Sequence, residues 1–370
     1  MSRADRWRPP AETPRARPGA GNVAPVATYD LLRDLPLRID AVETETREIV
    51  LSAEFTRRTT VVRLVGAEED GVGEDVTYDA TAQEWFPDLP TGEWTLASLS
   101  AALDGIALFP VAPEQRAWLD YRRWAIESAA LDLALRQSGT TLADVLRREV
   151  APVRYVVSTR ATTLEPLIEL YPAIRFKLDP TPDWTDELVR GLVALGRVDV
   201  VDLKGAYKGT VVDLAPNPVL YRRVAEAFPG AWIEDPALTP ETDPVLEPHR
   251  ERITWDAPIH SWSDVEALPF LPRCLNCKPS RFGTLARLFE FYDRCEEHGV
   301  ALYGGGQFEL GPGRGQIQLL AALFHPDASN DVAPAGFNEP RPRGGLPGSP
   351  LRLDAERGFR AEAAAGTFAA

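Results

Sequence analysis

Three carboxylates follow successive short apolar runs in the second half of the chain. Asp202 ends "VDVVD", Glu234 follows "AWI" and Asp256 follows "RITW", so the separations are 32 (234 minus 202) and 22 (256 minus 234) residues. Each separation fits one strand and one helix. Grouped anions repel one another unless a cation lies among them, and hard oxygen ligands suit Mg²⁺. The pattern therefore predicts a Mg²⁺ site made by these three residues, with solvated loop acids as the alternative.

Lysine is rare in this chain, and its few positions flank the carboxylates. Of 40 basic residues only Lys177, Lys204, Lys208 and Lys278 are lysines, which leaves 36 arginines. Lys177 lies one expected strand before the carboxylates and Lys278 one expected strand after them. A lysine near positive charges can lose its proton close to neutral pH, whereas an arginine cannot. We therefore expect Lys177 and Lys278 to be catalytic bases; chance placement of four lysines is the alternative.

Three further residues lie where they could reach a substrate. Glu309 follows the apolar run "VALYGGG", and His260 lies just past "RITWDAP". A hydrogen-bonded loop histidine is the alternative for His260, since most histidines have no catalytic role. Phe55 belongs to the polar stretch "SAEFTRRTT" in the first half of the chain. It is either a pocket wall or part of a plain solvent loop.

The elements that must position these residues form a repeating pattern. From about Pro152, short apolar runs alternate with helical segments and end with "DVAPAGF", which we expect to be the last strand. Such alternation predicts parallel strands with right-handed crossovers, and about eight units favour a barrel over an open sheet. In this kind of barrel the chemistry lies at the carboxyl ends of the strands. The carboxylates and lysines fall at those ends.

The first half of the chain has a different pattern. Two runs rich in β-branched residues, "LRIDAVETETREIVL" and "RTTVVRLVG", predict antiparallel strands, and "PEQRAWLDYRRWAIESAALDLALRQSG" predicts a helix that stops near Gly139. We expect a disordered leader at 1–25, an α+β domain at 26–150, a (β/α) barrel at 151–340 and a C-terminal segment at 341–370 that returns to the first domain. The fold class is therefore α/β.

The composition of the chain argues against nucleic acid and membranes as binding partners. The chain has 370 residues and a formal net charge of −15, so it offers no net positive field to nucleic acid or to anionic lipid. The sequence contains no uncharged apolar stretch of transmembrane length. Three cysteines are too few for a disulfide framework and favour a reducing, cytoplasmic compartment. Cys274 and Cys277 form a lone C-x-x-C, for which a buried structural role is favoured over zinc or redox chemistry.

Taken together, these motifs resemble the enolase superfamily, and most closely its mandelate-racemase-like and muconate-lactonising members. "GVGEDVTYD" looks like the family's glycine-glycine-glutamate segment, "WIEDP" like its fourth-strand motif and "NCKPSRFGTL" like its sixth-strand lysine motif. The resemblance covers most of the chain from about Pro36. It implies a modified (β/α)8 barrel, TIM-like with (β/α)7β order, and an α+β N-terminal capping domain.

The resemblance also implies an activity. Mg²⁺ held by Asp202, Glu234 and Asp256 would coordinate a small carboxylic acid, and Lys177 or Lys278 would remove its α-proton to give a metal-stabilised enediolate. The outcome would be racemisation or epimerisation, β-elimination or cycloisomerisation. Homo-oligomers are common among members of the family, and we expect one here.

Some positions depart from the family pattern. Arg175 replaces the first lysine of the K-x-K motif and keeps a cation beside Lys177. Lys204 stands where asparagine is usual, and would either pair with Asp202 or contact an anionic substrate. Ala257 replaces a common glutamate that would support the metal ligands. Glu309 takes the seventh-strand glutamate position, where it would orient the substrate or a lysine.

Two other functions fit part of the pattern. A class I aldolase would use Lys278 to form a Schiff base with a carbonyl substrate, but this leaves the three carboxylates unexplained. A non-catalytic scaffold would keep the barrel while Lys204 and Ala257 dismantle the metal site. Borohydride trapping of Lys278 with a keto acid would favour the aldolase. Failure to bind millimolar Mg²⁺ would favour the scaffold.

Overall fold

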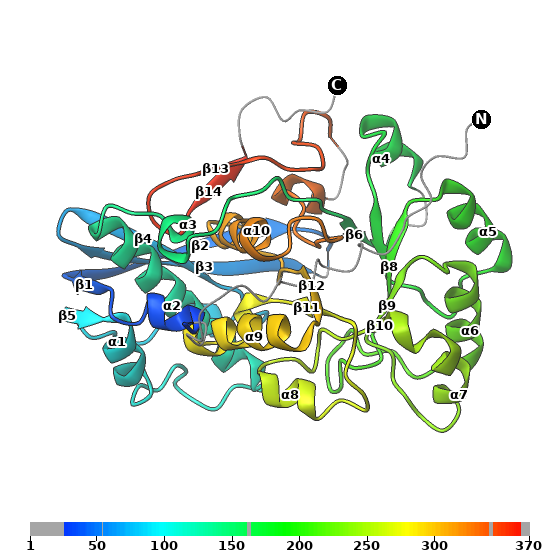
Figure 1. Cartoon of the computed structure of the whole chain (residues 1–370), viewed down its shortest axis with the longest axis horizontal. Helices are drawn as coiled ribbons and strands as arrows, with labels where there is room; N and C mark the ends of the chain where they lie inside the picture. The colour runs from blue at the N-terminus through cyan, green and yellow to red at the C-terminus, as the bar shows by residue number, and fades with distance from the viewer. Residues whose placement is uncertain (1–25, 54, 161–163, 340–342, 364–370) are drawn as a thin grey trace, which may run out of the picture.

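The structure is a computed structural model that describes residues 26–53, 55–160, 164–339 and 343–363. The expected leader at 1–25 lies outside these ranges, as does Glu54 beside Phe55. Figure 1 shows an N-terminal α+β part, drawn in blue and cyan, next to an α/β part drawn in green, yellow and orange. Among the described residues, none of the helices is both long enough and apolar enough to cross a membrane.

The N-terminal part is built on a sheet in which β3 pairs antiparallel with both β2 and β4. A separate antiparallel pair joins β1 to β5. Its strands are β1 (Pro36–Ile39), β2 (Ala41–Val50), β3 (Thr56–Gly66), β4 (Glu69–Asp75) and β5 (Gly92–Thr95). Its helices are α1 (Leu96–Leu103), α2 (Ala117–Gln137) and α3 (Leu142–Leu146), with 3₁₀ turns η1 (Thr28–Leu31) and η2 (Ala82–Glu84).

Two glycines allow α2 to pack directly on β4. A Cβ atom on Gly71 would lie 2.2 Å from the carbonyl oxygen of Ala129, and one on Gly73 would lie 2.0 Å from that of Ala125. Any larger residue would push the helix off the strand. This close approach explains the glycines of "GVGEDV". Every residue of α2 from Tyr121 to Leu135 is buried, because other elements pack on its remaining faces.

The barrel strands are parallel where they pair. Their bounds are β6 (Val157–Thr159), β7 (Phe176–Leu178), β8 (Val198–Asp202), β9 (Trp232–Glu234), β10 (Ile253–Thr254), β11 (Cys274–Cys277) and β12 (Ala301–Gly304). Neighbours follow the chain order from β6 to β10, and β11 pairs with β12. The N–H of Asn276 donates to Trp255 O at 3.1 Å and joins the two groups.

Asn330 and Asp331 close the ring. The N–H of Asp331 donates to Gly304 O at 2.7 Å, and Asn330 O accepts from the N–H of Val156 at 2.8 Å. These bonds link the end of β12 to the chain that leads into β6. The segment does not continue as the strand expected at "DVAPAGF". It makes isolated bridges and then the 3₁₀ turn η5 (Ala335–Asn338), because Pro334 before the turn has no N–H for a strand ladder.

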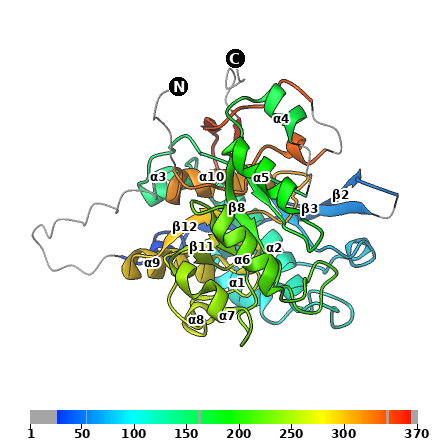
Figure 2. The same cartoon turned by 90° about the vertical axis from the view of Figure 1, so that its right-hand side faces the viewer.

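Helices cover the outside of the strands. Figures 1 and 2 show α5, α6 and α7 together on the outer side of β8 and β9. The helices of this part are α4 (Glu165–Leu170), α5 (Asp186–Leu195), α6 (Pro218–Ala227), α7 (Asp243–Leu246), α8 (Trp262–Glu266), α9 (Leu285–His298) and α10 (Gly313–Phe324). Two further 3₁₀ turns are η3 (Glu247–Arg252) and η4 (Pro279–Arg281).

The C-terminal segment forms a short antiparallel pair, β13 (Leu353–Ala355) and β14 (Ala361–Ala363). The N–H of Phe359 and the Nε of Arg360 donate to Asp132 on α2, at 2.8 and 2.6 Å. Gly315 on α10 leaves room for Ala361, whose carbonyl oxygen would lie 2.4 Å from a Cβ there. The segment therefore contacts both the N-terminal part and the barrel, and Figure 1 shows it beside α10.

Candidate metal and catalytic site

Consecutive barrel strands end in acidic residues on one side of the sheet. Asp202 is the last residue of β8 and pairs in register with Glu234, the last residue of β9. Asp256 follows β10 by two residues. Because side chains alternate between the two faces of a strand, residues in register point to the same face. All three residues are fully buried, so the strand ends enclose a cluster of carboxylates.

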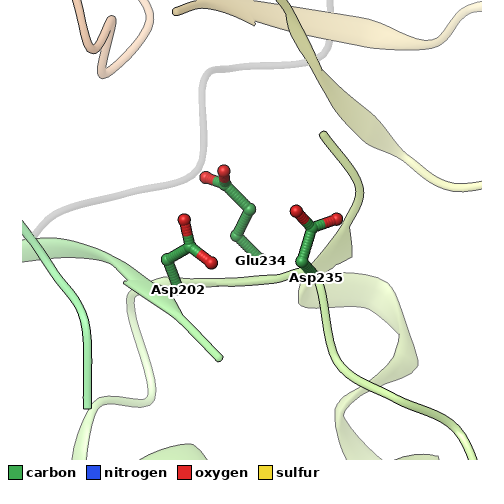
Figure 3. Close-up of side chains that lie close together, drawn as sticks. All are labelled: Asp202, Glu234 and Asp235. Carbon is green, nitrogen blue, oxygen red and sulfur yellow. The ribbon is translucent and has the colours of Figure 1, made fainter. Parts of the chain in front are cut away.

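Asp235 is a further member of this cluster that the sequence reasoning did not single out. One carboxylate oxygen from each of Asp202, Glu234 and Asp235 lies within 4.8 Å of the other two, and Figure 3 shows these side chains directed toward one space. Asp235 has a φ of 49°, a left-handed backbone that is uncommon for an aspartate within a buried strand end. The doublet of acids in "WIEDP" was the signal available in the sequence.

Lys177 contacts two acids of the cluster, Glu234 and Asp202. Its Nζ is 2.5 Å from Glu234 Oε1, 3.1 Å from Asp202 Oδ2 and 3.6 Å from Asp331 Oδ2. Burial by itself would lower the pKa of Lys177, but the carboxylates of Glu234, Asp202 and Asp331 raise this pKa well above its usual value. We expected a lowered pKa, with Arg175 as the neighbouring cation. Arg175 instead donates from Nε to Asp199 at 2.6 Å.

Lys278 follows β11 and contacts a different carboxylate. Its Nζ is 2.8 Å from Asp256 Oδ2. Arg281 also binds Asp256, with Nε 3.0 Å from Oδ1, and the hydroxyl of Tyr207 donates to Oδ2 at 2.6 Å. Burial would raise the pKa of Asp256, but Arg281 and Lys278 hold it well below its usual range. Arg281 was not among the expected site residues; "KPSR" places it one turn after Lys278.

The other two acids of the cluster have fewer positive neighbours. Burial raises the pKa of Glu234 to about 8, although Lys177 partly opposes this. Burial and the charges of Asp256 and Asp202 raise the pKa of Asp235 to about 7. Asp235 accepts hydrogen bonds from the backbone N–H groups of Asp256 and Ala257, at 2.9 and 3.0 Å. These buried acids fit a site for a small hard cation, whose charge would offset their mutual repulsion.

Two residues, Asp256 and Asp235, are candidates for the third metal ligand. Asp256 was expected beside Asp202 and Glu234, but its two oxygens contact Lys278, Arg281 and Tyr207. Among the described residues, the hydrogen bonds that the Asp235 carboxylate accepts come from backbone N–H groups. Asp256 remains our predicted third ligand, and Asp235 is a second candidate.

Of the remaining expected residues, Lys204 contacts the acidic cluster, whereas the contacts given for His260 and Glu309 are with other residues. Lys204 bonds Asp202, whereas His260 Nδ1 lies 2.9 Å from Arg281 O and 3.3 Å from Asp120 on α2. Glu309 Oε1 accepts from the N–H of Gln307 at 2.6 Å, and its Oε2 is 3.1 Å from Arg314. Phe55 lies between β2 and β3 and is exposed.

Comparison with solved structures identifies the fold. A dipeptide epimerase from Methylococcus capsulatus, in complex with Mg, matches with a TM-score of 0.66 and 20% identity over 88% of this chain and 99% of that chain. A muconate cycloisomerase from Pseudomonas fluorescens matches with a TM-score of 0.63 and 17% identity over 89% and 97%. The predicted TIM-like barrel with an N-terminal capping domain is confirmed, and the chain has the fold of the enolase superfamily.

Sequence comparison then gives the family. Models described as the C-terminal and N-terminal domains of "Domain of unknown function (DUF8230)" match residues 149–339 and 30–145. The chain belongs to the DUF8230 family. An o-succinylbenzoate synthase from Bacillus subtilis (strain 168) is 27% identical over 220 residues, 54% of this chain and 55% of that protein. The chain therefore matches about half the length of this curated relative, which, like the structural neighbours, is an enzyme.

Proposed function

We propose that this chain is a Mg²⁺-dependent isomerase or lyase that removes the α-proton of a small carboxylic acid with a lysine base. The product would be an epimer, an alkene or a lactone. The observation that carries the proposal is that Lys177, on β7, and Lys278, after β11, both contact the buried carboxylates at the ends of β8 to β10. Amines on two sides of one acidic cluster suit the removal and the return of a proton.

Asp202 and Glu234, with Asp256 or Asp235, would hold the metal. When bound, Mg²⁺ supplies positive charge at the substrate carboxylate, where negative charge develops as the α-proton leaves. Burial of all four acids keeps bulk water from the site, which strengthens such charge interactions. The Mg in the dipeptide epimerase complex and the reactions named for the relatives support this assignment.

The two lysines have different surroundings. Lys177 lies within 3.6 Å of three carboxylates, which favour its protonated form, so Lys177 carries a proton before the reaction begins. Lys278 shares its carboxylate, Asp256, with Arg281. Among the ion pairs of the described residues, Lys278 has one carboxylate partner, whereas Lys177 has three. We therefore assign Lys278 as the first base and Lys177 as the group that holds a proton on the other side.

The test is exchange of the substrate α-hydrogen in deuterated water with Mg²⁺. Candidate acids include dipeptides, because a second structure of the epimerase holds the dipeptide L-Arg-D-Lys, and precursors of succinylbenzoate-type products. We expect Lys278→Met to lower exchange by roughly 10²–10⁴-fold, while Lys208→Met, at an exposed lysine paired with Asp213, leaves it unchanged. Exchange that survives loss of both Lys177 and Lys278 would remove them from the mechanism.

One observation favours a second candidate, the non-catalytic scaffold. Lys204 already neutralises Asp202, so the acidic cluster is partly satisfied without a metal. A scaffold would show no Mg²⁺ binding by calorimetry at millimolar concentration and no exchange with any acid. An enzyme would bind Mg²⁺ and would exchange the α-hydrogen of its substrate.

A further inference from the structure

Lys204 lies in an unusual backbone conformation that turns its side chain back onto its own strand. Its φ is 52°, in the left-handed region that few non-glycine residues adopt. The conformation is held by neighbouring bonds: the N–H of Gly205 donates to Asp235 O at 2.8 Å, and Lys204 O accepts from the N–H of Leu214 at 3.0 Å. The side chain is therefore directed inward, with 12% of its surface exposed.

Lys204 binds both oxygens of Asp202. Its N–H donates to Oδ1 at 3.1 Å, and its Nζ donates to Oδ2. Lys177 contacts the same Oδ2 at 3.1 Å. A divalent cation on Oδ2 would lie beside the Lys204 ammonium and be repelled by it.

A second anion lies within reach of the same ammonium. Asp179, just beyond β7, has Oδ1 3.6 Å from Lys204 Nζ. That oxygen is buried and has no hydrogen-bond partner among the described residues, while Oδ2 of Asp179 pairs with Arg160 at 3.1 Å. Such an unsatisfied buried oxygen is uncommon. A small rotation of the Lys204 side chain would satisfy it.

We propose that Lys204 is an internal competitor of the metal, which neutralises Asp202 in the metal-free chain and moves to Asp179 when a divalent cation binds. The inference rests on the proposed metal site and concerns what regulates the affinity of that site for the metal. It has two consequences that an ordinary structural ion pair lacks. Removing the Lys204 charge makes the metal bind more tightly, and Asp179 influences metal affinity only while Lys204 is present.

The test is Mg²⁺ titration calorimetry, together with thermal unfolding in EDTA. The main variant is Lys204→Asn, since asparagine tolerates a left-handed backbone; Lys204→Met is the second neutral variant and Lys208→Met the matched control. We expect both neutral variants to bind Mg²⁺ at least about tenfold more tightly than the wild type, or about 1.4 kcal/mol. We also expect both to unfold at lower temperature in EDTA, because Asp202 loses a partner. Lys208→Met should match the wild type in affinity.

A double-mutant cycle with Asp179→Asn tests the movement. We expect Asp179→Asn to weaken Mg²⁺ binding in the wild-type background and to have no effect in the Lys204→Asn background. Unchanged or weaker binding by a folded Lys204→Asn, or tightening by Asn but not by Met, would overturn the inference while leaving the proposed function intact. Absence of Mg²⁺ binding by every variant would overturn both.

Discussion

At the scale of residues, the acids of the site do not share their counter-charges evenly. Asp256 contacts Lys278 and Arg281, and Asp202 contacts Lys177 and Lys204. These two have lowered pKa values, whereas the pKa values of Glu234 and Asp235 are raised. Burial raises the pKa of all four acids, so the split follows from the number of cations beside each one. Asp202 and Asp256 each have two, Glu234 has Lys177 alone, and Asp235 has none among the ion pairs of the described residues. The acids with raised pKa values are those that gain most from an added cation.

Asp235→Asn and Asp256→Asn should have different effects. Asparagine at 235 can still accept from a backbone N–H, so we expect little loss of stability in EDTA but at least about tenfold weaker Mg²⁺ binding. Asparagine at 256 leaves Lys278 and Arg281 without their carboxylate, so we expect a lower unfolding temperature even without metal. Thermal unfolding in EDTA and Mg²⁺ calorimetry measure the two effects.

Asp213→Asn, beside the exposed Lys208, is the control for loss of one negative charge. If a folded Asp235→Asn binds Mg²⁺ as the wild type does, Asp235 is not a ligand. Asp256 would then keep the role that the sequence predicts for it.

At the scale of elements, the side chains of Asn330 and His325 connect the end of β12 to the chain that leads into β6. Asn330 Oδ1 accepts from the N–H of Gly304 at 2.6 Å and contacts His325 Nδ1 at 2.7 Å. Asn330 Nδ2 donates to Arg154 O and His325 O, at 2.9 and 3.0 Å. Since Oδ1 can only accept, His325 Nδ1 carries the hydrogen. This network closes the ring where regular strand pairing is short.

His325 should make the stability of this join depend on pH. Burial lowers the pKa of His325 to about 4, while an unfolded histidine titrates near 6.5. Between these values the unfolded chain binds one more proton, so stability falls as pH drops from about 6.5 to about 4, by at most about 1.4 kcal/mol per pH unit. A further proton would go to Nε2, which faces the hydroxyl of Tyr292 at 3.4 Å.

The measurement is urea unfolding at pH 7 and pH 5. His325→Gln should lose less stability between these pH values than the wild type does. The control is His298→Gln, at an exposed residue that stacks on Trp262. An equal pH dependence in wild type and His325→Gln would contradict the assignment.

At the scale of the whole molecule, buried charges join the capping part to the barrel. Glu74 on β4 accepts from the N–H groups of Leu310, Gly311 and Gly313, at 2.6 to 3.0 Å. It therefore supplies a carboxylate at the N-terminus of α10, where the helix dipole favours negative charge. Arg57 on β3 donates to Gln307 O at 2.9 Å. These contacts fix the loop after β12 against the cap.

The C-terminal segment adds a second connection through Asp132. This fully buried carboxylate on α2 accepts from Arg360, Phe359 N–H and Val72 N–H. Arg360→Met would leave the carboxylate with backbone donors alone. We expect it to lower the free energy of unfolding by about 1–3 kcal/mol, measured by urea titration. Arg352→Met, at an exposed residue of the same segment, should have little effect; an equal loss would mean that Arg360 contributes only surface charge.

Much of the fold follows from local patterns. The repeated strand and helix signals from Pro152 predict the barrel strands, because a buried parallel strand needs an apolar run and an amphipathic helix needs a 3.6-residue period. The expected last strand falls at the right place in the ring, but Asn330 and Asp331 join the ring there through single hydrogen bonds and isolated bridges, not through a regular strand. The partners in those bonds, Gly304 and Val156, are distant in sequence. A local sequence pattern therefore does not show where the regular strand is lost.

For the site, the sequence by itself determined that scarce lysines and strand-end acids are distributed along one barrel, since residue type and spacing are local properties. Only the tertiary structure decided how the charges pair. It placed Lys204 on Asp202, gave Asp256 the guanidinium of Arg281, brought Asp235 into the cluster and turned Arg175 toward Asp199. The physical reason is that pairing depends on distances of a few ångströms between side chains from different strands, which spacing along the chain does not fix.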